Sequence, residues 1–136
     1  PTEIRTAIAA ARSRYMGRRL WVVWQPHTYS RTRTLFDAFI TAFAQADEVL
    51  VTEIYASREA APADGFSARQ VVNAMAHVRK HFIPDLAQVT DHLLGHLKAG
   101  DVLLVLSAGD ADQISTQVLA ALQAGRVTSA RSSAHD

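Results

Sequence analysis

Residues 25–32 carry more chemically useful side chains than any other stretch of the sequence. They include the imidazole of His27 and the guanidinium of Arg31, and they run into a predicted helix. Further hydroxyl groups come from Thr28, Tyr29, Ser30 and Thr32. Backbone N–H groups at a helix start carry partial positive charge, and an arginine can hold a carboxylate or phosphate through two parallel hydrogen bonds. The segment therefore predicts an anion site; a turn with polar capping residues is the alternative.

A second candidate segment is Ser107-Ala108-Gly109-Asp110, which lies between an apolar run and a predicted helix. In parallel sheets a loop at this place commonly holds a phosphate or a substrate, and Gly109 lets a ligand approach the backbone closely. Tyr55 follows another predicted strand and can line the same cleft. A strand-to-helix turn in which Asp110 caps the helix is the alternative.

Other catalytic or metal-binding arrangements are missing from the sequence. His77 with His81, and His92 with His96, have the i, i+4 spacing of helical metal ligands, but neither an H-E-x-x-H motif nor a cysteine accompanies them. We interpret them as solvated histidines and predict no metal site. The sequence has no G-x-S-x-G segment for a serine nucleophile and neither of the common glycine-rich nucleotide motifs. The chain therefore lacks a phosphate cradle that would hold ATP.

Hydrophobic periodicity places the two candidate segments at the ends of strands. Short apolar runs predict strands, and apolar residues at helical spacing predict helices between them. The predicted strands are 20–24, 48–52, 81–83 and 102–106. The first predicted helix follows the N-cap Thr2, and the second covers 35–43. The third follows the capping box at Ser67, the fourth follows the N-cap Asp85, and the last ends at Gly125.

Alternation of strands with helices predicts an α/β fold, a Rossmann-like three-layer sandwich with a mostly parallel sheet and helices on both faces. Ligands bind such sheets outside the carboxyl ends of the strands, where residues 25–32, 55–67 and 107–112 would meet. The loop at 55–66 is long enough to be functional. We expect residues 1–125 to form the domain and residues 126–136, which are small and polar, to form a disordered tail.

Length and composition are those of a single globular domain. The chain has 136 residues, 49% of them hydrophobic and 20% charged. Cysteine is absent, which excludes disulfides and fits a reducing cytoplasmic compartment. No apolar stretch is long enough to span a membrane and no signal peptide is apparent, so we expect a soluble, cytoplasmic protein without membrane insertion.

Charge is distributed unevenly along the chain. Residues 1–33 contain seven arginines and a single acidic residue, Glu3, although the formal net charge of the whole chain is +1. The asymmetry predicts an electropositive end that attracts anions. Few aromatic residues lie among the arginines, so we do not expect a nucleic-acid partner.

Several of these segments together resemble the C-terminal domain of the UDP-N-acetylmuramate:L-alanine ligases, the MurC members of the Mur ligase family. The most specific stretch is QPHTYSRT at residues 25–32, since other Mur ligases have different residues after this strand. The chain departs from the family pattern at Ser107, where glycine is common, and at Thr28, where a basic residue is common. The resemblance covers about residues 1–123 and rests on residues 1–4, 25–32, 47–49, 53–56, 100–102 and 108–110.

The resemblance implies a cytoplasmic ligase of peptidoglycan synthesis. In this family an N-terminal domain holds UDP-N-acetylmuramate and a central domain holds ATP and Mg²⁺, while the C-terminal domain closes over the site and presents L-alanine. ATP phosphorylates the muramoyl carboxylate and the alanine amine attacks the acyl phosphate. His27 and Arg31 match residues that hold the amino acid, with Arg31 for its carboxylate, and Ser107, Ala108, Gly109 and Asp110 match the loop that meets it. The domain alone is then expected to be inactive.

Two other functions fit the same residues. One is a non-catalytic Rossmann-like module that binds a nucleotide or another anion. The other is the sibling ligase that recycles a preformed murein peptide onto the same sugar.

Overall fold

Four strands form one sheet, in the order β3-β2-β1-β4, and every pairing is parallel. The computed structural model describes the backbone of residues 1–135 and the side chains of residues 1–125. The strands are β1 (Leu20–Trp24), β2 (Glu48–Val51), β3 (Lys80–Phe82) and β4 (Val102–Leu106). All four predicted strands are therefore present, and the predicted α/β class is confirmed.

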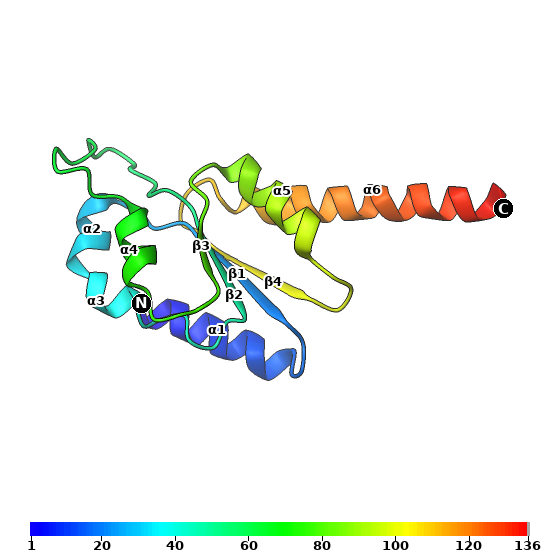
Figure 1. The fold of residues 1–136 in the computed structure, drawn as a ribbon, viewed down its shortest axis with the longest axis horizontal. Helices are drawn as coiled ribbons and strands as arrows, with labels where there is room; N and C mark the ends of the chain where they lie inside the picture. The colour runs from blue at the N-terminus through cyan, green and yellow to red at the C-terminus, as the bar shows by residue number, and fades with distance from the viewer. Residues whose placement is uncertain (136) are drawn as a thin grey trace.

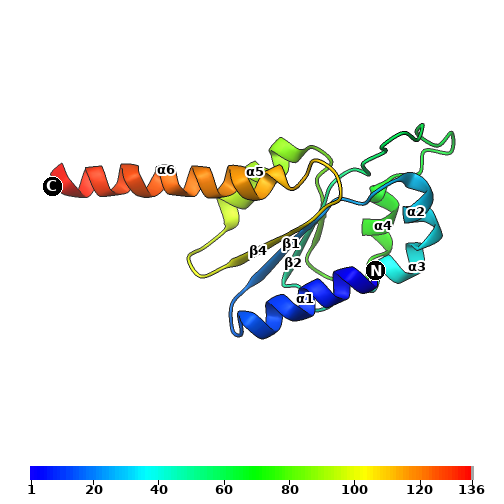
Figure 2. The same cartoon turned by 180° about the vertical axis from the view of Figure 1, so that it is seen from behind.

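Helices cover both faces of this sheet (Figures 1 and 2). Helices α1 to α4 lie on one face and α5 and α6 lie on the other, which gives the predicted Rossmann-like three-layer sandwich. The far end of α6 extends well away from the sheet (Figure 1). None of the described helices is both long and apolar enough to cross a bilayer. The helices are α1 (Thr2–Arg14), α2 (Tyr29–Thr34), α3 (Phe36–Phe39), α4 (Ala68–Ala74), α5 (Leu86–His96) and α6 (Gln113–His135).

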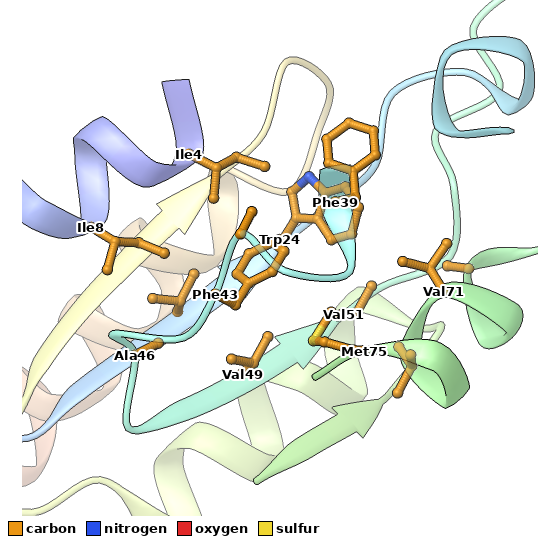
Figure 3. Close-up of a cluster of buried hydrophobic side chains, with 14 of the residues drawn as sticks. Ile4, Ile8, Trp24, Phe39, Phe43, Ala46, Val49, Val51, Val71 and Met75 are labelled. Carbon is orange, nitrogen blue, oxygen red and sulfur yellow. The ribbon is translucent and has the colours of Figure 1, made fainter. Parts of the chain in front are cut away.

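Strand β1 is buried on both faces because it is the inner strand between β2 and β4. Its side chains alternate, so that Val22 and Trp24 belong to the core beneath α1, α3 and α4, whereas Trp21 and Val23 belong to the core beneath α5 and α6. Figure 3 shows the first core, where the Trp24 ring packs against Phe39 and Phe43. The two cores fix the sheet and with it the positions where its strands end.

Three local predictions are wrong. The apolar pattern at 35–43 forms the short helix α3, preceded by the separate helix α2, because the backbone at Leu35 leaves the helical region. Pro1, not Thr2, occupies the N-cap position of α1. Helix α6 continues past Gly125 to His135, since a glycine without positive φ does not have to end a helix. The division of the chain into a domain and a tail at residue 125 stays a prediction.

The strand order changes direction between β1 and β4. From β1 the chain proceeds through β2 to β3 on one side, then returns by way of α5 to place β4 on the other side of β1. The connecting helices change face at the same point, so the loops after β1 and β4 diverge and leave a crevice. This is the position at which open α/β sheets bind ligands, and residues 25–32 and 107–110 flank it.

Candidate functional site

A pocket of about 310 Å³ lies at the carboxyl ends of β1 and β4. Its volume is at the small end of the range for ligand pockets. Side chains from α1, from β1 with the loop after it, from α2, and from β4 with the loop after it line the pocket. They are Glu3, Ile4, Trp24, Gln25, His27, Arg31, Leu106, Ser107 and Ala108. Four of the predicted site residues, His27, Arg31, Ser107 and Ala108, therefore lie around one cavity.

Arg31 is the cationic group of this pocket. Its side chain is exposed, and it makes no hydrogen bond or ion pair with any group in the part of the chain that the structure describes. By contrast, Arg33 on the same helix is held by Asp64 at 3.0 Å. An arginine that faces a cavity without an internal partner is available to bind a carboxylate or phosphate.

His27 and Tyr55 form one wall beside the pocket. Their rings stack with centroids 5.8 Å apart and planes 18° apart, and the two residues form an isolated parallel bridge. Tyr55 N–H donates to Pro26 O at 2.8 Å, and Thr28 N–H donates to Tyr55 O at 2.8 Å. These bonds extend the pairing of β1 with β2 beyond the strands, so the position of His27 is set by backbone contacts.

Thr28 has an unusual backbone conformation, with φ 63° and ψ 146°. A β-branched residue rarely adopts positive φ, and strain of this kind persists only where neighbouring contacts enforce it. Here the Thr28 hydroxyl accepts a hydrogen bond from Arg31 N–H at 3.3 Å, and its carbonyl accepts one from the Thr32 hydroxyl at 2.7 Å. The strained residue thus turns the chain from β1 into α2 and presents Arg31 to the pocket.

The start of α2 is filled by a side chain of the protein itself. Glu59 Oε1 accepts hydrogen bonds from Tyr29 N–H at 2.6 Å and from Ser30 N–H at 3.1 Å. Hydrogen bonds from the Ser30 hydroxyl and from the two N–H groups hold the pKa of the Glu59 carboxyl below its ordinary value. The backbone N–H groups at the start of α2, which were predicted to bind an anion, thus donate to Glu59. The remaining anion-binding candidate of this segment is the Arg31 side chain.

Gln25 ties the end of β1 to the loop after β4. Its side chain is only 6% exposed; its amide nitrogen donates to Asp110 Oδ1 at 2.8 Å, and its amide oxygen accepts from the Ser107 hydroxyl at 2.7 Å and from Ala111 N–H at 3.2 Å. Ser107 also accepts a hydrogen bond from Gly109 N–H at 3.0 Å. The Ser107 hydroxyl thus has a structural role at the start of this loop.

Gly109 lies where no other residue fits without movement. A Cβ atom there would be 2.7 Å from Tyr55 Cγ and 2.9 Å from Gln25 Oε1. Such distances are well inside van der Waals contact, so any side chain at this position would displace the loop or the tyrosine ring. Gly109 was predicted to let a ligand approach the backbone closely. In the structure, Tyr55 and Gln25 are the groups that approach it.

The structure separates the basic residues that the sequence groups together. Arg12 and Arg19 lie at the amino-terminal edge of the sheet, paired with Asp47 and Glu48, whereas Arg31 lies at the opposite edge. The single electropositive end predicted from charge is therefore wrong. The arginines are close in sequence but not in space, because α1 runs antiparallel to β1 and its last turn, which contains Arg12, lies away from the pocket.

The histidine pairs have different environments. Helix α4 ends at Ala74, so His77 and His81 do not share a helix, and His77 Nε2 instead lies 2.7 Å from Ala46 O. His92 and His96 do share α5, where their rings stack 4.1 Å apart. Within the described residues, no three acidic or histidine side chains gather as metal ligands do.

Sequence reasoning missed Glu59, and it includes Gln25 in the candidate segment 25–32 without giving it a role. Each acts on residues distant in sequence, Gln25 on Asp110 and Glu59 on Tyr29, so local patterns do not reveal them. Position was the available signal, since Gln25 is a polar residue directly after a fully buried strand. A polar side chain there must find partners across the sheet edge.

Comparison with known sequences identifies the domain family. Residues 1–109 match the family model described as "Mur ligase, glutamate ligase domain". A UDP-N-acetylmuramate--L-alanine ligase from Syntrophotalea carbinolica is 44% identical over 126 residues, which is 90% of this chain and 27% of that protein. A ligase of the same name from Bdellovibrio bacteriovorus is 40% identical over 119 residues, 88% of this chain and 26% of that protein. The chain thus spans about a quarter of the length of the curated relatives it matches.

Solved structures give the same fold. A murein peptide ligase from Psychrobacter arcticus superposes with a TM-score of 0.70 at 22% identity, covering 90% of this chain and 25% of that one. A domain of a Haemophilus ducreyi protein, described as a putative UDP-N-acetylmuramate:tripeptide ligase, superposes with a TM-score of 0.62 at 21% identity, covering 90% of this chain and 83% of that domain. The family model matches most of the chain and the fold agrees with it, so the chain belongs to the Mur ligase family as its glutamate ligase domain, the C-terminal part of MurC-like ligases.

Proposed function

We propose that this chain is the amino-acid-binding and closure domain of an ATP-dependent UDP-N-acetylmuramate:L-alanine ligase. The observation that carries the proposal is the Arg31 guanidinium, which faces a pocket of about 310 Å³ without an internal partner. A free arginine in a small cavity with apolar walls suits an α-amino acid with a small side chain, because its carboxylate can pair with the guanidinium. His27 borders the same cavity, and the loop 107–110 closes its other side.

The walls of the pocket support a small apolar side chain on the ligand. Ile4, Trp24, Leu106 and Ala108 supply apolar surface, while Arg31 and Glu3 supply opposite charges. An amino acid carries a negative carboxylate and a positive amine, so a pocket with both charges complements it. A nucleotide finds no glycine-rich cradle in the chain. These features favour the ligase domain over a nucleotide-binding module.

The chain has no glycine-rich loop that would cradle the phosphates of ATP, and Arg31 alone does not make a triphosphate site. We therefore assign ATP and Mg²⁺ to a central domain outside this chain, and UDP-N-acetylmuramate to an N-terminal domain. In this scheme ATP activates the muramoyl carboxylate as an acyl phosphate and the bound L-alanine amine attacks it. The isolated domain is inactive, and the complete ligase acts in the cytoplasm.

The names of the sequence relatives favour L-alanine over a murein peptide as the acceptor. The relatives at about 40% identity are named L-alanine ligases, whereas the murein peptide ligase of known structure is 22% identical, which supports only the fold.

The experiment is phosphate release by the complete polypeptide that carries this chain, with ATP, Mg²⁺ and UDP-N-acetylmuramate. The acceptors are L-alanine, glycine, L-serine, the murein tripeptide and none. We expect release that depends on L-alanine. Release stimulated only by the tripeptide would assign the sibling ligase instead, and release with no acceptor dependence would remove the proposal. The 136-residue chain alone is the control and should release no phosphate.

A further inference from the structure

Gln25 is a polar residue that is buried at the carboxyl end of an apolar strand. It is the first residue after β1, it is 6% exposed, and the strand before it is entirely apolar. A buried amide must have its donors and acceptors satisfied, so an apolar residue would be simpler if only packing mattered. The partners of Gln25 show what its polarity achieves.

All partners of the Gln25 side chain lie in one short segment. They are Ser107, Asp110 and Ala111, the first, fourth and fifth residues after β4. The Gln25 backbone N–H also donates to Leu106 O at 3.0 Å, which continues the β1–β4 pairing up to the loop. One side chain from β1 therefore determines the path of the loop that follows β4.

The orientation of the amide is defined by its partners. The Asp110 carboxylate can only accept, so it faces the amide nitrogen; Ala111 N–H can only donate, so it faces the amide oxygen. A carboxylate in place of the amide would keep the second contact and oppose Asp110 in the first. The arrangement thus requires an amide on one side and a carboxylate on the other.

The loop so fixed is part of the pocket wall. Gln25, Ser107 and Ala108 line the cavity together with Arg31. Gly109 is held against Gln25 Oε1 on one side and the Tyr55 ring on the other. A shift of the loop would therefore change the wall that faces a ligand bound to Arg31.

We infer that Gln25 is a positioning residue that holds the loop 107–111 in its amino-acid-binding conformation. The inference deepens the proposed function and rests on it for the identity of the ligand. Gln25 itself need not touch the reacting atoms; it acts through Ser107 and Asp110. Its loss should weaken use of the amino acid while leaving use of the nucleotide and of the sugar nucleotide unchanged.

The test uses Gln25→Glu, Asp110→Asn and the double variant in the complete ligase. Gln25→Glu opposes two carboxylates, and the double variant restores a donor–acceptor pair with its polarity reversed. We expect Gln25→Glu to raise the KM for the amino acid by about 10- to 100-fold, with the KM for ATP and for UDP-N-acetylmuramate within about twofold. The double variant should recover to within about threefold of the parent. Gln123→Glu, an exposed glutamine on α6, is the matched control and should change nothing.

Hydrogen exchange of the same complete polypeptides separates this inference from the proposed function, because it needs no turnover. Peptides that cover residues 107–111 should exchange faster in Gln25→Glu and in the uncharged variant Gln25→Met, and at the parental rate in the double variant. Unchanged exchange in both single variants would overturn the inference, as would a Gln25→Glu variant that raises all three KM values alike. If the parent enzyme shows no amino-acid-dependent release, the proposed function fails and the exchange result still decides whether Gln25 positions the loop.

Discussion

At the amino-terminal edge of the sheet, Asp47 accepts hydrogen bonds from Leu20 N–H and from the Arg12 guanidinium, each at 2.6 Å, so charge and backbone are joined in a closed network. At the carboxyl-terminal edge, Arg31 faces a pocket and has no partner in the described part of the chain. The two edges belong to the same strands, and the two arginines compared here differ: Arg12 is paired with a carboxylate, whereas Arg31 is not.

Other contacts at the amino-terminal edge have the same closed character. Asp101 accepts hydrogen bonds from the Trp21 indole N–H and from Lys98 N–H, both at 3.0 Å. Glu48, the first residue of β2, lies 3.9 Å from Arg19 and 3.4 Å from His81. These acidic residues at the starts of strands contact neighbouring segments, while Arg19 Nε is buried without a hydrogen-bond partner among the described residues.

The carboxyl-terminal edge combines internal bonds with groups left available. Gln25 and Glu59 hold the two loops in place, but they leave the Arg31 side chain facing the cavity. A charged side chain with satisfied internal partners stabilises the fold, whereas one whose head group faces a pocket without a partner is available to bind a ligand.

The largest expected effect is at Arg31. Arg31→Ala in the complete ligase should raise the KM for L-alanine by a factor of tens or more, since loss of a charge-assisted contact costs about 2 to 3 kcal/mol. Its unfolding free energy should stay the same, because no internal contact is lost. Steady-state kinetics and chemical denaturation measure the two effects. Arg18→Ala, an exposed arginine near the other edge, is the control, and an equal rise in KM for both variants would break the comparison.

Gly109→Ala should give the next largest effect, through shape instead of charge. Its Cβ would lie 2.7 Å from Tyr55 Cγ, so the loop or the ring must move at a cost of about 2 kcal/mol. We expect a higher KM for L-alanine together with a lower midpoint of thermal unfolding. Adding Tyr55→Ala removes the nearest atoms and should restore part of the stability. A Gly109→Ala variant with parental kinetics would show that the loop can vary without consequence for the pocket.

Asp47→Asn tests the closed edge. The Leu20 N–H keeps an acceptor, but the charge-assisted bond from Arg12 is lost, and we expect unfolding to become easier by about 1 kcal/mol with unchanged kinetic constants. Burial raises the pKa of Asp47, but the hydrogen bonds from Leu20 and Arg12 outweigh it and the net shift is downward. The stabilisation is therefore present above about pH 4 and lost as pH falls through the folded pKa. Denaturant titrations should show that the difference in unfolding free energy between the parent and Asp47→Asn shrinks from neutral to acidic pH. A difference that stays constant with pH would contradict a stabilising role for the ionised Asp47 carboxylate.

The sheet was predictable because its signals are local. The run Leu20–Trp24 is apolar throughout, as a strand covered on both faces must be, and the weaker strand near His81 was marked by the proline after it. The capping box at Ser67 and the N-cap at Asp85 also appear as predicted, since each involves residues within three positions of one another. Parallel strands then place their carboxyl ends together, which brought His27, Arg31 and Ser107 to one pocket.

What could not be predicted depends on distance along the chain. Gln25 meets Asp110 across 85 residues and Glu59 meets Tyr29 across 30, and no local pattern specifies either pair. The early end of α3 has a related cause, because residues 35–43 have helical periodicity but the Ile40 carbonyl accepts a hydrogen bond from the distant Ala76 N–H at 2.9 Å. Charge counting failed similarly, since it ignores which arginines the fold neutralises.

The smallest expected effect concerns His92 on α5, which packs against the same closed edge. Burial lowers the pKa of His92, the charges of His96 and His81 lower it further, and Glu48 opposes them. The unfolded chain therefore binds a proton at this position near pH 6.5 while the folded chain binds it only at lower pH, so stability declines as pH falls below about 6.5. His92→Gln should flatten the dependence of unfolding free energy on pH between 7 and 5, by less than about 1 kcal/mol. Glu48→Gln should steepen it, because it removes the charge that favours protonated His92. Equal slopes of unfolding free energy against pH in the parent and both variants would mean that the neighbouring charges do not affect protonation of His92. Of the contacts at this edge, only those of Asp47 and Asp101 would then be expected to stabilise the fold.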